Sequence, residues 1–459
     1  MDTIAIIGGG PAGYVAAITA ARQDKHVVLI EEAELGGTCL NEGCMPTKSL
    51  LESAEIYGNV KRAKRFGISL PEEEVRIDWR RVQQYKDNTV KKLVLGVRHL
   101  MKKNRIEVIR GTASFVNDHL LQVETKEGTQ EIAANRYIIA AGSEPIALPF
   151  APFDGEWILH SKHAIALSKL PESLVIVGGG VIGCEFASIY SRMGCEVTVI
   201  EMGDHILPEE DADIAETLQA QLKKDGVTVY ASARLEELDK ANRLAVIRQG
   251  EVRIEKQADC VLVAIGRKPR TEQLGLDRAG IMYTEHGIEV DEEMRTNIPH
   301  IYACGDIVGG VQLAHLAFHE GEIAALNACG MSRQVNHRTI PRCIYTWPEV
   351  AGVGLTERQA RAKYGDVRIG EFSFHANGKA LILQEQTGKV KVITEPSFQE
   401  ILGISIVGPR ATELIGQGTL IMYTEMTVDT MGDFLAAHPT LAEAIQEAVR
   451  AATGAAVHI

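Results

Sequence analysis

Two cysteines, Cys39 and Cys44, stand five positions apart in the stretch GGTCLNEGCMPTKSL at residues 36–50. In a continuous helix five residues rise about 7.5 Å, and the two side chains leave from different faces. A disulfide needs Cα atoms about 4.4–6.8 Å apart. We predict that Gly43 and Pro46 bend the backbone until the two sulfurs meet. A strained pair this close in sequence is typical of a redox-active disulfide rather than a structural one.

The chain has eight cysteines, and most of the other six stand singly in apolar surroundings such as ADCVLVAIG and IYACGD. Such cysteines are typical of buried, unreactive thiols. In a reducing compartment a lone close pair is a better candidate for redox chemistry than for stabilisation. Structural zinc needs four ligands, and no second Cys or His pair with ligand spacing occurs, so we expect no metal.

A gapless internal repeat organises the first half of the chain. The stretch IAIIGGGPAGYVAAITAARQDKHVVLIE (residues 4–31) matches LVIVGGGVIGCEFASIYSRMGCEVTVIE (residues 174–201) at an offset of 170, with 10 of 28 positions identical. Each copy has an apolar strand, the pattern G-x-G-x-x-G, a helix, a second apolar strand and a final Glu. This context makes the motif far more specific than the glycines alone.

The motif is typical of dinucleotide binding. The first Gly makes a tight turn, the second lets the backbone approach a pyrophosphate, and the third lets helix and strand pack closely. The helix N-terminus stabilises the phosphate charge, and the acidic residue accepts hydrogen bonds from ribose hydroxyls. The residues in these positions are Gly8, Gly10, Gly13 and Glu31 in the first copy and Gly178, Gly180, Gly183 and Glu201 in the second. Two copies predict two dinucleotides, most simply a flavin and a nicotinamide.

The segments around the two copies predict the remaining architecture. A helix is expected over about 78–104, and NRYIIAAGSEP (135–145) and DCVLVAIGRKP (259–269) read as strands that return the chain between the two nucleotide folds. The strand in TNIPHIYACGDIVGG (296–310) is followed by Asp306, which would face the ligand crevice of the sheet or serve as a turn residue. The last 120 or so residues alternate as strands and helices without a nucleotide motif, which predicts an α+β domain.

Length and charge exclude several classes of protein. A chain of 459 residues is too long for one core and predicts about three domains. The net charge of −13 argues against a nucleic-acid or anionic-membrane partner. No run approaches 18 apolar residues, and no charged and apolar leader precedes Thr3. We therefore expect a cytoplasmic protein, or a mature form that has lost a targeting segment.

The motifs together resemble the pyridine nucleotide-disulfide oxidoreductases, the family that holds glutathione reductase, mercuric reductase and dihydrolipoyl dehydrogenase, and they resemble the last branch most. The resemblance covers nearly the whole chain through GGTCLNEGCMPTK, AAGSEP, AIGRKP, YACGD, QLAH, YTWPEVAGVG and AHPTLAE, besides the two Gly-rich motifs. It implies an α/β protein with two Rossmann-like domains and a C-terminal α+β dimerisation domain. The implied boundaries are 1–145 for the first part of the FAD-binding domain, 146–266 for the NAD-binding domain, 267–332 for the central, second part of the FAD domain, and 333–459 for the interface domain.

The resemblance also implies which residues bind the cofactors FAD and NAD. For FAD these are Gly8, Gly10, Gly13, Glu31, Gly37, Thr38, Lys48, Ala113, Ala141, Gly142, Ser143, Asp306, Gln312, Leu313, Ala314 and His315. For NAD they are Gly178, Gly180, Ile182, Gly183, Glu185, Glu201 and Gly266.

The catalytic roles implied by the resemblance centre on the cysteine pair. Cys39 would be the thiol that meets the substrate, and Cys44 the thiolate beside the flavin. Lys48 would pair with Glu185 across the two nucleotide domains. The acid/base would be His438, oriented by Glu443, and it would reach the cysteines of the other subunit in a homodimer.

His438 also has a purely structural interpretation. Thr440 and Glu443 fit the capping box S/T-x-x-E at the start of the helix in LAEAIQEAVRAA, which would leave His438 as an incidental residue before a helix. The two interpretations are compatible, because Pro439 restrains the backbone after the histidine and a capped helix start is a rigid platform.

Rival branches and local departures refine the expectation. The C-terminal cysteine pair of mercuric reductases is missing, since the last cysteine is Cys343, and Glu201 would repel the 2′-phosphate of NADP. Three positions depart from the common pattern: Ala436 and Trp347 stand where His is frequent, and Arg270 where Asn or Thr is common. The first two bear on the thiol-binding pocket.

The sequence thus predicts FAD-dependent oxidation of protein-bound dihydrolipoyl groups with reduction of NAD+, through Cys39 and Cys44. The partner would be a lipoyl domain of an acyltransferase or a lipoyl carrier protein, in a 2-oxo acid dehydrogenase-type complex. Two alternatives remain. One is NADH-dependent reduction of another low-molecular-weight disulfide, and the other is a non-catalytic flavoprotein assembly subunit.

Overall fold

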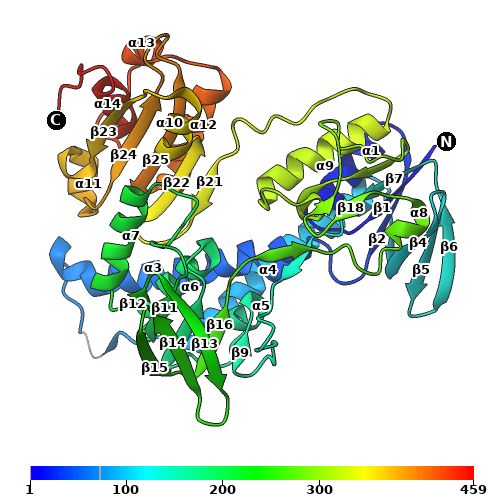
Figure 1. The fold of residues 1–459 in the computed structure, drawn as a ribbon, viewed down its shortest axis with the longest axis horizontal. Coiled ribbons are helices and arrows are strands. Elements are labelled where there is room, and N and C mark those ends of the chain that lie inside the picture. The colour runs from blue at the N-terminus through cyan, green and yellow to red at the C-terminus, as the bar shows by residue number, and fades with distance from the viewer. Residues whose placement is uncertain (1, 72–73, 459) are drawn as a thin grey trace.

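Each copy of the repeat builds a five-stranded parallel sheet in the computed structural model, which describes residues 2–71 and 74–458 (Figure 1). The first sheet has the order β20-β7-β1-β2-β3 and the second the order β12-β11-β10-β16-β9. The first comprises β1 (Thr3–Ile7), β2 (His26–Glu31), β3 (Glu107–Arg110), β7 (Arg136–Ile139) and β20 (Ile301–Ala303). The second comprises β9 (Ile158–Leu159), β10 (Ser173–Val177), β11 (Glu196–Ile200), β12 (Thr228–Tyr230) and β16 (Cys260–Val263).

Except for the edge strands β3 and β12, the strands are almost wholly buried and apolar, as parallel strands covered on both faces must be. Helix α1 (Pro11–Ala21) follows β1, and α6 (Val181–Arg192) follows β10, so the internal repeat is a repeat of structure. On the first sheet α1 packs against α9 (Ala314–Ala328), and the long helix α4 (Trp79–Lys103) begins at Asp78, whose side chain accepts a hydrogen bond from the Arg81 N–H. These findings confirm the expected α/β fold class.

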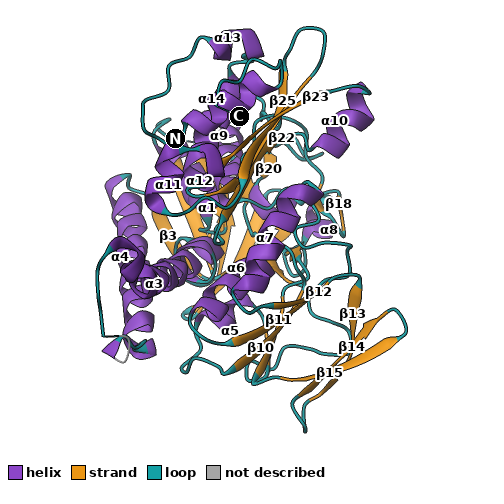
Figure 2. Ribbon diagram, turned by 90° about the vertical axis from the view of Figure 1, so that its left-hand side faces the viewer, coloured by secondary structure: helices purple, strands orange, loops and turns teal. Residues whose placement is uncertain are grey.

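A three-stranded antiparallel meander accompanies each parallel sheet. The first consists of β4 (Thr112–Asn117), β5 (Leu120–Thr125) and β6 (Gly128–Ala133), and the second of β13 (Ala233–Asp239), β14 (Leu244–Gln249) and β15 (Val252–Gln257). Figure 2 shows the second meander standing apart at the lower right, beyond β10 and β11. The duplication therefore extends beyond the segment in which the sequences align.

The two chain returns pair with each other. The strand predicted in 135–145 stops at Ile139, and Gly142 turns the backbone with a φ of 75°. A separate strand, β8 (Ser143–Pro145), then runs antiparallel to β17 (Arg267–Pro269). The expected link between the two nucleotide folds is thus a two-stranded ribbon.

The C-terminal part is an α+β unit with a five-stranded antiparallel sheet of order β21-β22-β25-β24-β23. Its strands are β21 (Arg342–Ile344), β22 (Glu349–Gly354), β23 (Arg368–Ser373), β24 (Lys389–Thr394) and β25 (Ile401–Gly408). Its helices are α10 (Glu357–Tyr364), α11 (Gly378–Leu383), α12 (Ala411–Tyr423), α13 (Val428–Gly432) and α14 (Glu443–Ala451). The unit has its own apolar core and lies on the side of the molecule away from β4–β6 (Figure 1).

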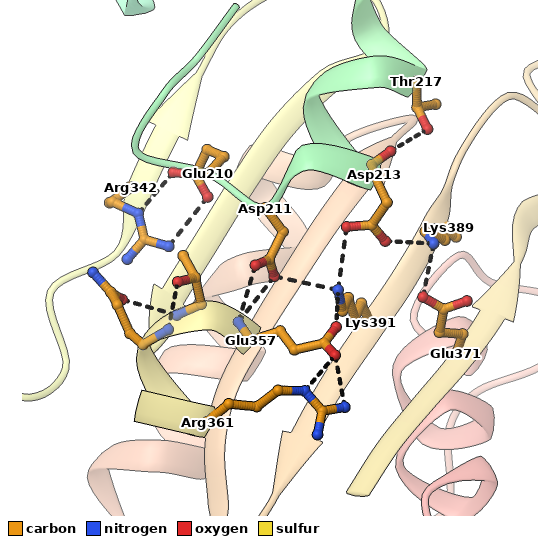
Figure 3. A network of polar contacts seen from close by, with 12 residues as sticks. Glu210, Asp211, Asp213, Thr217, Arg342, Glu357, Arg361, Glu371, Lys389 and Lys391 are labelled. Carbon is orange, nitrogen blue, oxygen red and sulfur yellow. Dashed lines mark hydrogen bonds and ion pairs between the residues drawn. The ribbon is translucent and has the colours of Figure 1, made fainter. Parts of the chain in front are cut away.

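A partly buried ionic network joins this unit to the second nucleotide fold at the start of α7 (Ala212–Lys224), as Figure 3 shows. The ammonium of Lys391 on β24 lies 3.4 Å from Asp211, 3.1 Å from Asp213 and 2.7 Å from Glu357. Because buried charges must be paired, these contacts favour one arrangement of the two units. In the part of the chain that the structure describes, no helix has the length and apolar character needed to cross a bilayer.

Candidate active site

The cysteine pair lies where two helices meet. Cys39 is in the short helix α2 (Gly37–Asn41), and Cys44 is the first residue of α3 (Cys44–Arg62). Gly43 makes the break between them with φ −139° and ψ −106°, as expected. Pro46 was wrongly expected to bend the chain: it lies in the first turn of α3, where a proline costs little because those N–H groups have no partner within the helix.

The two sulfurs are in contact as free thiols, and their protonation is unequal. The hydrogen bond from Cys39 lowers the pKa of Cys44 to about 7, with the charge of Lys48 acting in the same direction against burial. The same hydrogen bond, together with burial, raises the pKa of Cys39. The helix N-terminus also favours a negative charge on Cys44. Cys44 is therefore the thiolate of the pair, and Cys39 keeps the proton.

An ion pair next to the cysteines joins the two nucleotide folds. Lys48 Nζ on α3 lies 2.8 and 2.7 Å from the two carboxylate oxygens of Glu185 on α6. The Glu185 side chain is buried, and its Oε1 also accepts a hydrogen bond of 3.0 Å from the backbone N–H of Tyr345. The ammonium of Lys48 lies 4.6 Å from the centre of the Tyr345 ring. The structure thus contains the pair that the family resemblance implies, with Tyr345 as a partner not expected from the sequence.

The first Gly-rich loop has the geometry of a nucleotide cradle. Gly8 has a φ of 100°, and a Cβ there would lie 2.3 Å from the carbonyl oxygen of Ala140. A Cβ on Gly13 would lie 1.8 Å from the Gly8 oxygen, whereas one on Gly10 would meet nothing closer than 3.8 Å. The open side at Gly10 and the free N–H groups at the start of α1 fit a pyrophosphate.

The second loop repeats this geometry. Gly178 has a φ of 106°, a Cβ on Gly183 would lie 1.9 Å from the Gly178 oxygen, and a Cβ on Gly180 would meet nothing within 4 Å. In both loops a side chain would therefore find space at the second glycine of the motif, but would clash with the backbone at the first and the third. These residues fit a dinucleotide at each loop.

Glu31 and Glu201, at the end of β2 and just after β11, each accept hydrogen bonds from two backbone N–H groups. Glu31 accepts hydrogen bonds from the N–H groups of Gly9 (2.6 Å) and Ala33 (2.7 Å). Glu201 accepts them from Gly179 (2.6 Å) and Gly203 (2.6 Å). A carboxylate can accept about four hydrogen bonds, so two acceptor sites on each Glu remain for ribose hydroxyls.

A polar cluster at the carboxyl end of β20 includes a residue that the sequence reasoning missed. Asp306 lies in the 3-10 turn Gly305–Val308, and its Oδ2 accepts a hydrogen bond of 2.5 Å from the Ser143 hydroxyl. Arg267 donates to the Ser143 hydroxyl (2.8 Å) and to the Ser143 carbonyl (2.7 Å). Burial lowers the pKa of Arg267. A cation directly after an apolar strand end was the available signal.

The other residues implied for the cofactors take several positions. Gly37 and Thr38 lie in α2, Ile182 in α6 and the buried Ala113 in β4. Gln312 and Leu313 lead into α9, which Ala314 and His315 begin, and a nitrogen of His315 lies 2.8 Å from the Pro341 carbonyl oxygen. Ala141 and Gly142 follow β7, and Gly266 precedes β17 with a φ of 133°.

His438 and Glu443 form a second, separate pair. His438 Nδ1 lies 2.9 Å from Glu443 Oε1, and Glu443 Oε2 accepts a hydrogen bond of 2.8 Å from the Thr440 N–H. The expected capping box is only half present: the Thr440 hydroxyl donates to the Ala437 carbonyl instead, and Ala442 is the N-cap of α14. Glu443 therefore orients the imidazole and the preceding turn together.

One chain does not bring His438 to the cysteines. The His438 side chain is 78% exposed, whereas Cys39 is 7% exposed and sits against Cys44. An imidazole that exposed is not packed on a buried thiol. The two halves of the predicted catalytic group are therefore apart within one subunit.

One group among the described residues has the donor types of a metal site: Asp118, His119 and His300, with ligand atoms within 4.8 Å of one another. The two imidazole rings stack at 4.3 Å, and a ring nitrogen of His300 already lies 2.7 Å from the Asp118 carbonyl oxygen. The group lies at the β4–β5 turn and before β20, on elements that carry neither cysteine.

Comparisons with known proteins agree with this architecture. Residues 2–321 match the model of the family described as pyridine nucleotide-disulphide oxidoreductase, and residues 340–449 match the dimerisation domain of the same family. A dihydrolipoyl dehydrogenase of Bacillus subtilis is 56% identical over 456 residues, which is 99% of this chain and 100% of the relative. A dihydrolipoyl dehydrogenase of Chlamydia pneumoniae is 40% identical over 99% of this chain and 97% of its own length.

Two solved structures have the same fold as this chain. LpdA from Mycobacterium tuberculosis superposes with a TM-score of 0.91 and 30% identity, over 98% of this chain and 99% of that one. The flavoprotein disulfide reductase RclA from Escherichia coli, in a Cu(II) complex, has a TM-score of 0.87 and 29% identity, with 98% of each chain covered. The chain is an oxidoreductase that uses FAD and NAD(H), and it belongs to the pyridine nucleotide-disulphide oxidoreductase family.

Proposed function

We propose that this oxidoreductase oxidises protein-bound dihydrolipoyl groups to lipoyl groups, with NAD+ as the acceptor, as the dihydrolipoyl dehydrogenase component of a 2-oxo acid dehydrogenase-type complex in the cytoplasm. The observation that carries the proposal is the contact between Cys39 and Cys44, with a thiolate at Cys44 stabilised beside Lys48. The identity of 56% to a dihydrolipoyl dehydrogenase over the whole chain supports the substrate class.

The thiol chemistry follows from the unequal cysteines. One thiolate of the dihydrolipoyl group attacks Cys39 Sγ of the oxidised pair, and Cys44 leaves as a thiolate. The second substrate thiol then attacks the mixed disulfide, which releases the lipoyl disulfide and returns Cys39 as a thiol. Two electrons have then moved from the substrate to the cysteine pair. The low pKa of Cys44 makes it the better leaving group.

Protons and cofactors complete the cycle. Thiols must lose protons to attack, and His438, held by Glu443, is the group we assign to accept them. Because His438 is exposed in one chain, we propose a homodimer in which it serves the cysteines of the partner subunit. FAD, when bound, carries the electron pair from the thiolate side to NAD+. Lys48 and Glu185, which are paired at 2.7 Å, would lie beside the flavin.

The domain boundaries and cofactor residues expected from the sequence are part of the proposal. β20 joins the sheet of β1, β2 and β7, which supports an FAD-binding domain built from 1–145 and 267–332. The NAD-binding domain would then be 146–266 and the interface domain 333–459. The dinucleotide geometry of both Gly-rich loops supports FAD at Gly8–Gly13 and NAD at Gly178–Gly183.

A steady-state assay decides between this function and its rivals. We expect turnover with dihydrolipoamide and NAD+ to exceed, by orders of magnitude, turnover with NADH and glutathione disulfide. The reverse result would assign the chain to another disulfide substrate, as the name of the RclA neighbour suggests for that protein. Bound flavin without turnover of either substrate would favour an assembly subunit.

Selectivity for NAD over NADP is a separate expectation. Glu201 already holds two N–H groups, and its negative charge would face the 2′-phosphate of NADP. We expect kcat/KM for NAD+ to be at least about tenfold higher, and a Glu201→Gln variant to narrow the gap. Equal values for the two cofactors in the unmodified enzyme would contradict this role of Glu201.

A further inference from the structure

The loop between β21 and β22 lies against helices of both nucleotide folds. Its backbone at Tyr345 donates a hydrogen bond of 3.0 Å to Glu185 on α6, and the Tyr345 ring faces the Lys48 ammonium on α3 at 4.6 Å. One residue of the C-terminal unit therefore contacts both members of the ion pair that joins α3 to α6.

Trp347, two residues further on, makes a second connection between the same helices. The guanidinium carbon of Arg62, the last residue of α3, lies 4.2 Å from the centre of the indole ring. That of Arg192, the last residue of α6, lies 4.3 Å away. Two guanidinium groups repel each other, and an aromatic face attracts both. Trp347 thus offsets the repulsion between the two guanidinium groups at the ends of α3 and α6.

The surface of α3 is shaped for this contact. Arg192 lies against Gly58, where a Cβ would come within 2.3 Å of the arginine Nη2. Arg62 is also held by Glu385, at 3.3 Å, and both of these side chains are largely buried. Desolvation strengthens a cation–π contact, so the buried setting favours this arrangement.

The two helices also share a buried apolar core, to which α3 contributes Leu50 and Ala54 and α6 contributes Phe186 and Tyr190. A pocket of about 230 Å³ lies between α3 and the C-terminal unit, and its wall includes Lys48, Glu52, Arg192, Tyr345 and Trp347. The aromatic loop contacts therefore extend the α3–α6 connection from this core to the C-terminal ends of both helices.

We propose that Trp347, together with Tyr345, is a positioning element that holds α3 against α6 and thereby keeps Lys48 and Glu185 paired beside the cysteines. The loop contacts α3 near both of its ends, so it sets the orientation of the helix as well as its position. The consequence for turnover rests on the proposed function, whereas the structural role does not.

Hydrogen–deuterium exchange of the holoenzyme tests the structural role. Trp347→Leu keeps an apolar side chain but removes the aromatic face, and we expect amides in Cys44–Arg62 and Val181–Arg192 to exchange about 5- to 30-fold faster, the factor that two cation–π contacts supply. Trp347→Phe, which keeps a ring, should restore most of the protection. Phe398→Leu, a change at a residue that is 84% exposed, is the matched control and should leave both helices unchanged.

A variant on the other side of the contact keeps the test decisive if Trp347→Leu folds poorly. Gly58→Ala adds a Cβ where the Arg192 guanidinium lies and leaves the loop unaltered. We expect it to speed exchange in Val181–Arg192, whereas the higher helix propensity of Ala opposes faster exchange in α3 itself. Exchange like that of the unmodified protein in both Trp347→Leu and Gly58→Ala would overturn the proposal. So would a Trp347→Phe variant no better protected than Trp347→Leu.

Kinetics then separate this inference from the proposed function. With an active unmodified enzyme, we expect Trp347→Leu to lower kcat for dihydrolipoamide about 5- to 30-fold with KM unchanged, and Trp347→Phe to recover it. A raised KM with normal kcat would place Trp347 in substrate binding and overturn its positioning role. An unmodified enzyme that does not oxidise dihydrolipoamide would refute the proposed function, while the exchange experiment would still report on the loop.

Discussion

The cysteine pair and the His438–Glu443 pair differ in how much of their surroundings a single chain supplies. Cys39 and Cys44 are enclosed by α2 and α3, and Cys44 has the hydrogen bond and the cation that stabilise its thiolate. His438 is held firmly by Glu443 but faces outward, with 78% of its side chain exposed. One subunit thus supplies the groups that stabilise the Cys44 thiolate, whereas the His438–Glu443 pair is open to contact with another surface.

The largest effect on turnover is expected at the cysteine pair. Replacing Cys44 with Ser removes the leaving thiolate, so oxidation of dihydrolipoamide should fall below detection while flavin stays bound. Flavin absorbance and steady-state turnover measure the two properties, and NADH-to-quinone activity, which needs no thiol, is the control. Full dihydrolipoamide turnover by Cys44→Ser would make the cysteines merely structural.

Removing the His438 imidazole should lower turnover less than removing the Cys44 thiolate. His438→Gln removes the proposed base, and the expected loss of dihydrolipoamide oxidation is about 10²–10⁴-fold. NADH-to-quinone activity should largely survive, because that reaction bypasses the thiols.

Mixed dimers test whether the two halves come from different subunits. Combining Cys44→Ser with His438→Gln chains leaves one intact site per heterodimer if the base acts across the interface. We expect about half the activity of the unmodified dimer. A well-folded, flavin-loaded heterodimer without activity would show that both groups serve the same chain.

The orientation of the base should matter less than its presence. Glu443→Gln keeps the shape but loses the charge that faces the imidazole and the Thr440 N–H. Hydrogen bonds to charged groups are worth about 1.5–3 kcal/mol, so kcat should fall about 10- to 100-fold. The matched control is Glu447→Gln on the same helix, whose carboxylate binds the Val457 N–H instead. Equal losses in the two variants would point to helix stability rather than to His438.

The smallest effect concerns the thiolate itself. Lys48→Met removes a cation that lowers the pKa of Cys44, so this pKa should rise from about 7 by about 1. At pH 7 the thiolate fraction then falls about fivefold, and alkylation of the reduced protein by iodoacetamide should slow by that factor. The difference should vanish above pH 9, where both proteins are ionised. An unchanged profile would leave the hydrogen bond from Cys39 as the main cause.

Local patterns predicted the features that depend on short stretches of chain. The helix and strand order of both nucleotide folds follows from the repeat, since the third glycine of each motif contacts the first within the same βαβ unit, as Gly13 does with Gly8. Two local details were wrong. Pro46 continues α3 instead of bending it. Thr440 does not cap α14, because its hydroxyl donates a hydrogen bond to the Ala437 carbonyl instead.

What the sequence by itself determined is thus the chemistry available: two dinucleotide cradles, a close cysteine pair and a histidine followed by a glutamate. Only the tertiary structure decided which distant groups meet. Lys48 and Glu185 are 137 residues apart, and Arg267 lies 124 residues from Ser143. Trp347 reaches the ends of two helices from a third unit of the chain. Such contacts depend on how whole sheets and helices dock, which is set by the sum of many weak packing and ionic interactions and not by any short pattern.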